Sequence, residues 1–311
     1  MQKSGNTESW MQYTEHTTPD LRATRPIVAF ETTVLSFGLP WPTNRDVALS
    51  CEAIAREHGV TPATLGVLNR KAVVGLSEEQ LDLFCRPKRG AVKVNLQNLA
   101  AALQLDTPGA LTVATTLNVA SQADIRVAVT GGIGGVHRGY AESHDVSSDL
   151  VALARFPVAM VCSGIKSILD VPATLERLET LGVPVVGYKT RTFPFFYAGE
   201  SNIELETTTD SLEEVAAIAQ THWNIGGRGI LVVTPVPAQH SVAPVELEEW
   251  IADANRVAQI GRVSGKAVTP FLLKKLEEFS RGKSLAANVA LLENNAHVGS
   301  QLAVELHKTR G

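Results

Sequence analysis

Short apolar runs rich in β-branched residues alternate with longer segments of helical amphipathic spacing along most of the chain. Strands are predicted at residues 27–30, 64–68, 71–74, 91–94, 111–112, 125–130, 158–162, 185–188 and 229–233. Helices are predicted at residues 45–58, 77–84, 95–104, 113–121, 171–180, 211–224, 245–257, 269–280 and 284–305. Strands that alternate with helices predict an α/β fold, in which helices cover both faces of a parallel or mixed sheet.

Local signals refine this pattern. Asn44 is a candidate N-cap for the helix at residues 45–58, and Gly59 is its stop signal. The strands at 64–68 and 71–74 form a predicted hairpin around Asn69 and Arg70. Residues 1–25 are polar and lack periodicity, so we expect a mobile arm, with order beginning near Ile27. Residues 26–311 show no break in composition, which favours a single α/β catalytic domain.

Composition then excludes several classes of protein. The chain has 311 residues, of which 44% are hydrophobic, enough to fill a core and exclude overall disorder. A net charge of −4 and only 5% aromatic residues argue against a nucleic-acid partner. Neither a signal peptide nor a membrane span is predicted, and the spacing of Cys51, Cys85 and Cys162 fits no disulfide or zinc motif. We therefore expect a cytoplasmic protein without a membrane partner.

A glycine-rich loop follows the predicted strand that ends at Thr130. Four glycines fall within five residues: Gly131, Gly132, Gly134 and Gly135. Glycine permits positive φ and close backbone approach, so such a loop can direct several N–H groups at an anion. The spacing does not match the dinucleotide fingerprint, because His137 stands where the third glycine is required. A tight loop without a ligand explains the glycines equally well.

Acidic and polar side chains come next. Asp145 and Asp149 are four residues apart, which would place them on one face of a helix. Mg²⁺ and Mn²⁺ favour carboxylates and water as ligands, so the pattern is compatible with a metal site. A helix start capped by Ser143 or Asp145 is an equally good interpretation. His144 fits a polar surface position better than a ligand position.

Two lysines are candidates for chemistry. Lys166 follows a buried-looking strand and precedes Ile168 and Leu169. A desolvated lysine is a nucleophile that forms Schiff bases, whereas pairing with Asp170 or snorkelling at a helix start would be structural. Lys93, in the predicted strand AVKVN, raises the same question of burial, and its three donors suit a phosphate.

Glu31 is the third candidate. It ends the first predicted strand and precedes the turn-forming segment SFGLPWPTN. The carboxyl ends of strands are where α/β enzymes place acid–base groups. A role in capping or in the turn is the structural alternative.

Six segments, taken in order, resemble the motifs of the pseudouridine-5′-phosphate glycosidase family, which also includes relatives from natural-product gene clusters. They are residues 31–44, 129–139 (VTGGIGGVHRG), 145–150, 161–170, 269–273 and 282–288. The resemblance covers residues 27–305. It implies a three-layer α/β/α fold with a central mixed sheet, and a homotrimer.

The resemblance also implies roles for individual residues. Lys166 corresponds to the lysine that forms an imine with C1 of the sugar, and Glu31 to the proton donor for the departing base carbon. Asp145 corresponds to the ligand of a Mn²⁺ (or Mg²⁺) that is otherwise held largely by water. The positions that correspond to the ribose 5-phosphate site are Lys93, Val113, Ser147, Ser148 and Asp149. Thr130, His137 and Asn288 correspond to further substrate-binding positions.

This chemistry explains the residue types. A C-glycosidic bond has no leaving-group oxygen or nitrogen to protonate, so the two carboxylates of an ordinary glycosidase are insufficient. An imine at C1, together with an acid that protonates the base carbon, provides a route. Because the steps are reversible, the same site can also form the bond.

The chain departs from the family motifs where the ring is expected. Phe37 stands in place of a histidine, the neutral residues 95–98 replace a charged run, and Thr234 replaces an asparagine. These changes favour C-ribosylation of an aromatic acceptor larger than uracil, in natural-product biosynthesis. The alternative is cleavage of pseudouridine 5′-phosphate to uracil and ribose 5-phosphate. A sugar-phosphate-binding protein without catalysis is disfavoured by the presence of both Lys166 and Glu31.

Overall fold

A mixed β-sheet forms the centre of the computed structural model, which describes residues 9–86, 91–199, 201–263 and 268–309. The strand order is β1-β4-β3-β2-β7-β9-β13-β11-β12, and β6 and β5 branch from β3. The strands of this sheet are β1 (Met11–Tyr13), β2 (Ile27–Phe30), β3 (Thr61–Leu68), β4 (Lys71–Val74), β5 (Val92–Val94), β6 (Gly109–Leu111), β7 (Val127–Val129), β9 (Ala159–Cys162), β11 (Val185–Tyr188), β12 (Thr207–Thr209) and β13 (Ile230–Val233). A separate antiparallel pair joins β8 (Val136–His137) to β10 (Leu169–Asp170).

The pairing of the strands follows from the sequence pattern. Strands β3, β2, β7, β9, β13, β11 and β12 pair in parallel, each with its neighbour. Every residue of β2, β9 and β13 is buried, as expected for parallel strands covered on both faces. The predicted hairpin is confirmed: β3 and β4 are antiparallel, and Asn69 and Arg70 turn between them with φ of 49° and 61°.

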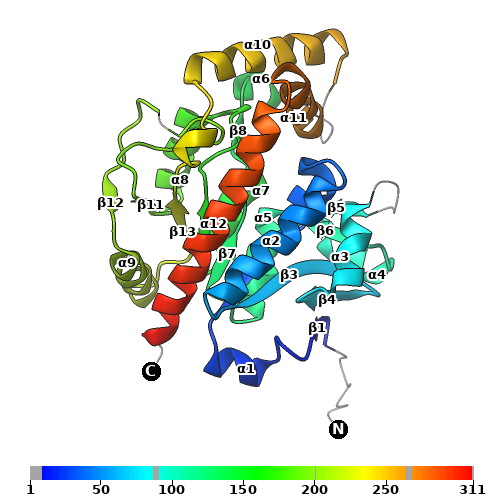
Figure 1. Cartoon of the computed structure of the whole chain (residues 1–311), viewed down its shortest axis with the longest axis vertical. Helices are drawn as coiled ribbons and strands as arrows, with labels where there is room; N and C mark the ends of the chain where they lie inside the picture. The colour runs from blue at the N-terminus through cyan, green and yellow to red at the C-terminus, as the bar shows by residue number, and fades with distance from the viewer. Residues whose placement is uncertain (1–8, 87–90, 200, 264–267, 310–311) are drawn as a thin grey trace.

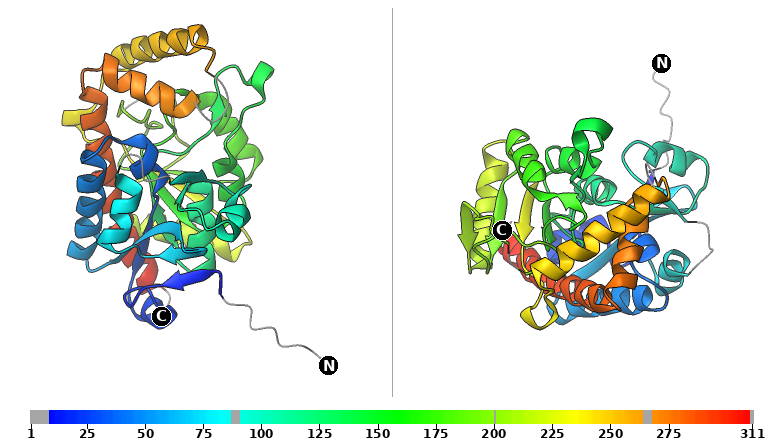
Figure 2. Two further views of the ribbon diagram at one scale, coloured as in Figure 1. Left: turned by 90° about the vertical axis from the view of Figure 1, so that its right-hand side faces the viewer. Right: turned by 90° about the horizontal axis from the view of Figure 1, so that it is seen from above.

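Helices cover both faces of the sheet, which confirms the predicted α/β fold (Figures 1 and 2). On one face lie α2 (Thr43–Glu57), α9 (Leu212–Asn224) and α12 (Lys283–Lys308). On the other lie α5 (Val113–Gln122), α7 (Ser148–Leu153) and α8 (Val171–Thr180). Across the top of the view in Figure 1, α10 (Pro244–Ile260) packs against α11 (Val268–Phe279). Within the described ranges, no helix is long and apolar enough to cross a membrane.

Smaller elements complete the fold. They are α1 (Pro19–Thr24), the π-helical turn η1 (Val34–Gly38), α3 (Glu78–Cys85), α4 (Leu99–Gln104), α6 (Tyr140–Ser143) and the 3₁₀ turn η2 (Ala238–His240). Ser77 caps α3 and forms a capping box with Gln80.

The expectation of a mobile arm up to residue 25 is wrong for the part that is described, while residues 1–8 lie outside the described residues. Strand β1 pairs in parallel with β4. The Thr17 hydroxyl, which is buried, donates to the carbonyl of Val74 at 2.6 Å. An edge strand is held by its backbone and needs few apolar side chains, so the polar sequence concealed it.

The prediction for Asn44 is also wrong. Helix α2 begins at Thr43, and no side chain caps it. The Asn44 amide instead donates to the carbonyls of Leu35 and Cys85, both at 2.7 Å. These bonds fix η1 against the end of α3, and η1 follows directly on the segment that carries Glu31. The predicted end of the helix at Gly59 is confirmed, because Gly59 has a φ of +71° just after α2.

Candidate active site

One cavity of about 40 Å³, named here the Lys166 cavity, collects six of the residues predicted from sequence. They are Glu31, Phe37, Lys93, Thr130, Lys166 and Asn288. Glu31 and Thr130 directly follow the parallel strands β2 and β7, and Lys166 lies four residues beyond the end of β9. The carboxyl ends of parallel strands meet at one edge of a sheet, which explains why these distant residues converge. Helix α12 brings Asn288 to the same place.

Glu31 has a buried carboxyl group that is hydrogen-bonded to the end of a neighbouring strand. It is 4% exposed, and the Thr130 hydroxyl donates to its carboxylate. Burial raises the pKa of Glu31, while the positive charge of Lys166 and the Thr130 bond act in the opposite direction. A carboxyl group with a raised pKa, close to a lysine, is suited to donate a proton near neutral pH.

The loop that carries Lys166 is held tightly by its backbone. The Lys166 N–H donates to the carbonyl of Ile133 at 3.1 Å, and its own carbonyl accepts from the N–H of Leu169 at 3.0 Å. Gly164 has a φ of +86°, and a Cβ there would lie 2.2 Å from the carbonyl oxygen of Pro194. Among the described residues no ion pair joins Lys166 to Asp170, whose carboxylate caps α8 instead. The half-buried lysine is therefore positioned for the cavity rather than for a structural pair.

The structure answers the open question of whether Lys93 is buried. Lys93 is exposed on the short strand β5, whereas Val94 is buried. Lys93 lines the wall of the Lys166 cavity, and an ammonium group is a donor type that suits a phosphate.

The glycine loop owes its composition to close packing. None of its four glycines has a positive φ, contrary to the expected use of glycine there. A Cβ on Gly134 would lie 2.4 Å from Oγ of Ser147, and one on Gly135 would lie 2.4 Å from Oγ1 of Thr174. The Gly134 N–H donates to a carboxylate oxygen of Asp149 at 2.8 Å. This N–H is directed at a protein carboxylate, not at an external anion.

A second group of predicted residues lies behind the glycine loop. The Ser147 hydroxyl accepts from the N–H of Asp149 and caps α7, which begins at Ser148. The Asp149 carboxylate also accepts from the N–H of Ala114 at 2.9 Å, next to Val113 at the start of α5. These residues do not line the Lys166 cavity, but the Asp149 charge contributes to the raised pKa of Glu31.

The expected pairing of two aspartates on one helix face is wrong. Asp145 precedes α7, whereas Asp149 lies within it, and the cap is Ser147 rather than Ser143 or Asp145. The half-exposed Asp145 carboxylate instead faces His137, with 3.8 Å between Oδ2 and Nε2. Burial lowers the pKa of His137 and Asp145 opposes that shift. His137 and Asp145 therefore form a third group, beside the lysines rather than in the Lys166 cavity.

The side chains of this third group, His137 and Asp145, determine which metal ion could bind there. Across the part of the chain that the structure describes, no three histidine, cysteine or acidic side chains are grouped to hold a metal. An ion at Asp145 would keep water as most of its ligands. One accessible carboxylate with water fits Mn²⁺ or Mg²⁺, which are hard cations that retain water readily.

Sequence reasoning missed much of the cavity wall. Besides two of the loop glycines, the further lining residues are Thr33, Val34, Gly38, Phe196, Thr269 and Leu273. Thr269 and Leu273 belong to a motif segment without an assigned role, and they show that α11 covers the site. Phe196 is buried with a φ of 58°, and a Cβ on Gly132 would lie 2.6 Å from its ring. Nothing in the local sequence signals that contact.

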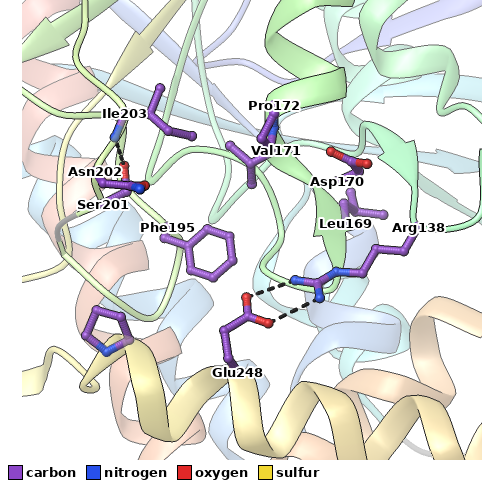
Figure 3. Close-up of a pocket in the computed structure, with 11 residues that line it drawn as sticks. Arg138, Leu169, Asp170, Val171, Pro172, Phe195, Ser201, Asn202, Ile203 and Glu248 are labelled. Carbon is purple, nitrogen blue, oxygen red and sulfur yellow. Dashed lines mark hydrogen bonds and ion pairs between the residues drawn. The ribbon is translucent and has the colours of Figure 1, made fainter.

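A larger cavity of about 720 Å³ lies beside β10, and none of the predicted site residues lines it. At its edge Arg138 and Glu248 face each other, and the ring of Phe195 points into it (Figure 3). The Arg138 guanidinium donates to both Glu248 oxygens, at 2.9 and 3.2 Å, and to the carbonyl of Ser167 at 3.5 Å. Arg138 thus links α10 to the residue after Lys166.

The fold and the cavity together define an α/β enzyme with a lysine and a buried acid at the carboxyl edge of its sheet. The chain belongs to the indigoidine synthase A-like protein family, whose model matches residues 17–305.

Curated relatives match over almost their whole length. Two are named pseudouridine-5′-phosphate glycosidase. The protein from Caldanaerobacter subterraneus subsp. tengcongensis is 43% identical over 289 residues, covering 93% of this chain and 94% of the relative. The protein from Symbiobacterium thermophilum is 45% identical over 306 residues, covering 95% and 99%.

Solved structures share the fold. The prealnumycin C-glycosynthase AlnA, in complex with ribulose 5-phosphate, has a TM-score of 0.88 at 33% identity, covering 96% of this chain and 98% of that one. An indigoidine synthase A-like protein from Thermotoga maritima has a TM-score of 0.88 at 35% identity, covering 98% and 100%. The predicted fold and family are thereby confirmed.

Proposed function

We propose that this enzyme breaks the C-glycosidic bond of pseudouridine 5′-phosphate and releases uracil and ribose 5-phosphate. The observation that carries the proposal is the Lys166 cavity, in which a lysine and a buried carboxyl of raised pKa share one small space with Lys93. The names of relatives at 43% and 45% identity support this substrate. They favour cleavage over the C-ribosylation that the sequence alone placed first.

In the proposed mechanism the Lys166 amine adds to C1 as the furanose ring opens, and the ring oxygen takes up a proton. The nitrogen lone pair then forms the C1=N bond while the bond from C1 to the base breaks. Its electron pair passes to the base carbon, which receives the proton of Glu31. Thr130 orients the Glu31 carboxyl through their hydrogen bond. Water hydrolyses the imine, which frees Lys166 and ribose 5-phosphate.

The other predicted residues have supporting roles in this proposal. Lys93 binds the phosphate, and the group behind the glycine loop holds the sugar side in place: Val113, Ser147, Ser148 and Asp149. His137 and Asn288 bind the departing ring. Mn²⁺ or Mg²⁺ at Asp145 would supply a positive charge near the substrate. A cytoplasmic homotrimer is the proposed assembly.

C-ribosylation of an aromatic acceptor is the second candidate. Phe37, where the family motif has histidine, lines the Lys166 cavity and is 38% exposed, so it offers an apolar surface to a ring. The similarity to the prealnumycin C-glycosynthase supports this direction of the reaction.

Borohydride trapping tests the shared chemistry. Wild-type protein with ribose 5-phosphate and borohydride should gain the mass of the reduced sugar phosphate on Lys166, located by peptide mapping. Lys166→Ala should abolish trapping and uracil release, whereas the exposed Lys308→Ala, a matched control, should retain both. Trapping elsewhere than Lys166, or turnover by Lys166→Ala, would refute the imine mechanism. Uracil release from pseudouridine 5′-phosphate then separates the two candidate substrates.

A further inference from the structure

Two histidines meet where α2 packs against α12 (Figure 1). His58 directly follows α2 and lies three residues before β3 begins at Thr61, so it lies at the amino edge of the parallel strands. His297 lies on α12, nine residues beyond Asn288. Nine residues of helix span ~13.5 Å. The pair is therefore separate from the Lys166 cavity, which lies at the carboxyl edge of the sheet.

A ring nitrogen of one histidine faces a ring nitrogen of the other. Nε2 of His58 and Nδ1 of His297 are 3.0 Å apart, and the two rings are nearly perpendicular, at 86°. Two imidazole nitrogens bound to one metal ion at ~2.0–2.1 Å are ~2.8–3.0 Å apart at a right angle and ~3.3–3.4 Å apart at a tetrahedral angle. The observed separation already lies within the range that a single ion requires.

The backbone holds both histidines in place and leaves the pair accessible. The His58 N–H donates to the carbonyl of Ala55 at 3.1 Å, which fixes it to the last turn of α2. His297 stands between Ala296 and Val298, both of which are buried. His297 itself is exposed and His58 is half-buried, so an ion with water ligands can approach. The negative end of the α2 dipole also favours a cation beside His58.

The two nitrogen ligands determine which ions fit. Imidazole nitrogen suits Ni²⁺, Cu²⁺ and Zn²⁺, whereas Mg²⁺ and Mn²⁺ favour carboxylate, carbonyl and water oxygens. In the part of the chain that the structure covers, no third histidine, cysteine or acidic side chain joins the pair. Water would therefore complete the coordination of an ion bound here.

We propose that His58 and His297 form a binding site for a divalent transition-metal ion of the group Ni²⁺, Cu²⁺ and Zn²⁺, which links the end of α2 to α12. Nε2 of His58 and Nδ1 of His297 bind the ion, and each neutral ring carries its proton on its other nitrogen. Only folding brings together these two residues, which are 239 positions apart, so the ion binds the folded chain and stabilises it. The site is independent of the proposed catalytic function.

Ni²⁺ is the probe for the first test, by calorimetry and by urea unfolding with Ni²⁺ or with EDTA. Wild-type protein should bind Ni²⁺ and unfold at a higher urea concentration in its presence. His58→Gln and His297→Gln should each weaken Ni²⁺ binding at least ~10-fold, because loss of an outer-shell partner alone costs 10–100-fold, and each should abolish the shift in midpoint. His16→Gln is the matched control, because the His16 side chain is 77% exposed and is not part of the pair.

Electron paramagnetic resonance of bound Cu²⁺ gives a second readout that does not depend on stability. Nitrogen hyperfine splitting should indicate two imidazole ligands in the wild type and no more than one in His58→Gln or His297→Gln. The midpoints measured in EDTA show whether each variant is folded. Mg²⁺ should not distinguish the wild type from either variant, which separates this pair from an oxygen site at Asp145.

The outcomes distinguish this site from the catalytic proposal. Equal Ni²⁺ binding by the wild type and both variants would overturn the site, and so would a wild type whose midpoint does not respond to Ni²⁺. The pair would then be a hydrogen bond between two side chains and nothing more. Neither measurement uses a substrate, so that result would leave the imine chemistry standing. Failure of borohydride trapping would likewise leave the metal site standing.

Discussion

We expect Gly134→Ala to lower the free energy of unfolding, and the contacts around Gly134 allow the loss to be estimated. The new Cβ would lie 2.4 Å from Oγ and 2.6 Å from Cβ of Ser147, and 2.9 Å from Oδ2 of Asp149. The Ser147 hydroxyl can rotate, but its Cβ is fixed to the backbone, so the start of α7 must shift. Overpacking of this kind costs ~1–3 kcal/mol. The shift also breaks the 2.8 Å bond from the Gly134 N–H to Asp149, a charged acceptor worth ~1.5–3 kcal/mol.

Together these costs predict a loss of about 2.5–6 kcal/mol in the free energy of unfolding. Equilibrium unfolding in urea, followed by circular dichroism, measures it as a lower midpoint at an unchanged slope. Gly199→Ala is the matched control, because its nearest neighbours would lie 3.4 Å from the new Cβ, an ordinary contact. The control should change stability by less than ~0.5 kcal/mol. If both variants unfold at the same urea concentration, close packing is not what requires glycine at position 134.

Three further predictions concern the site. Glu31→Gln should lower the rate of bond cleavage at least ~10²-fold with little change in sugar-phosphate binding; normal turnover with weak binding would reassign Glu31 to recognition. Since burial raises the pKa of Glu31 and the protonated form is the donor, wild-type kcat should fall as pH rises through that pKa, and a flat alkaline limb would contradict this. Chelation should suppress activity and Mn²⁺ restore it, with Asp145→Asn unresponsive to added Mn²⁺; full activity of protein shown to be metal-free by elemental analysis would contradict a metal role. Glu248→Gln should cost no more than ~1 kcal/mol in urea unfolding, because both partners of its pair with Arg138 are half exposed; a larger loss would mean that Arg138 depends on Glu248 for more than an ion pair.

Sequence patterns predicted the buried elements well. The bounds of β2, β11 and α8 coincide with those predicted, because a continuous apolar run or a cap marks each of them. Helix α8 has Asp170 as its cap and a proline in its first turn, two signals that act within a few residues.

The features that the sequence did not predict depend on edge strands or on contacts between distant segments. Strand β12 (Thr207–Thr209) and strand β1 lie at the two edges of the sheet, where backbone bonds hold a strand whose side chains remain largely outside the core. The role of Asn44 and the crowding at Gly134 depend on contacts with segments distant in sequence, which periodicity does not encode.

The sequence identified the reactive polar residues of the Lys166 cavity but not the apolar residues of its wall. Glu31 and Lys166 have residue types that stand out against apolar surroundings, and the family resemblance placed Asn288 beside them. Leu273 and Phe196 enclose the same cavity, but an apolar residue in an apolar segment has no such contrast. Sequence therefore predicted the polar groups, and only the structure shows the apolar residues of the wall.

The position of α12 has a consequence for biosynthesis. This helix covers β2, β7 and β9 and carries Asn288 to a cavity begun by Glu31, 257 residues earlier in the chain. A ribosome adding ~5–20 residues per second needs roughly 13–51 s to make that interval. Once β9 has been made, the apolar face of β2, β7 and β9 waits for α12, which is the last of these elements in the chain. We expect the Lys166 cavity to close only after α12 leaves the ribosome, because α12 supplies Asn288 to its wall.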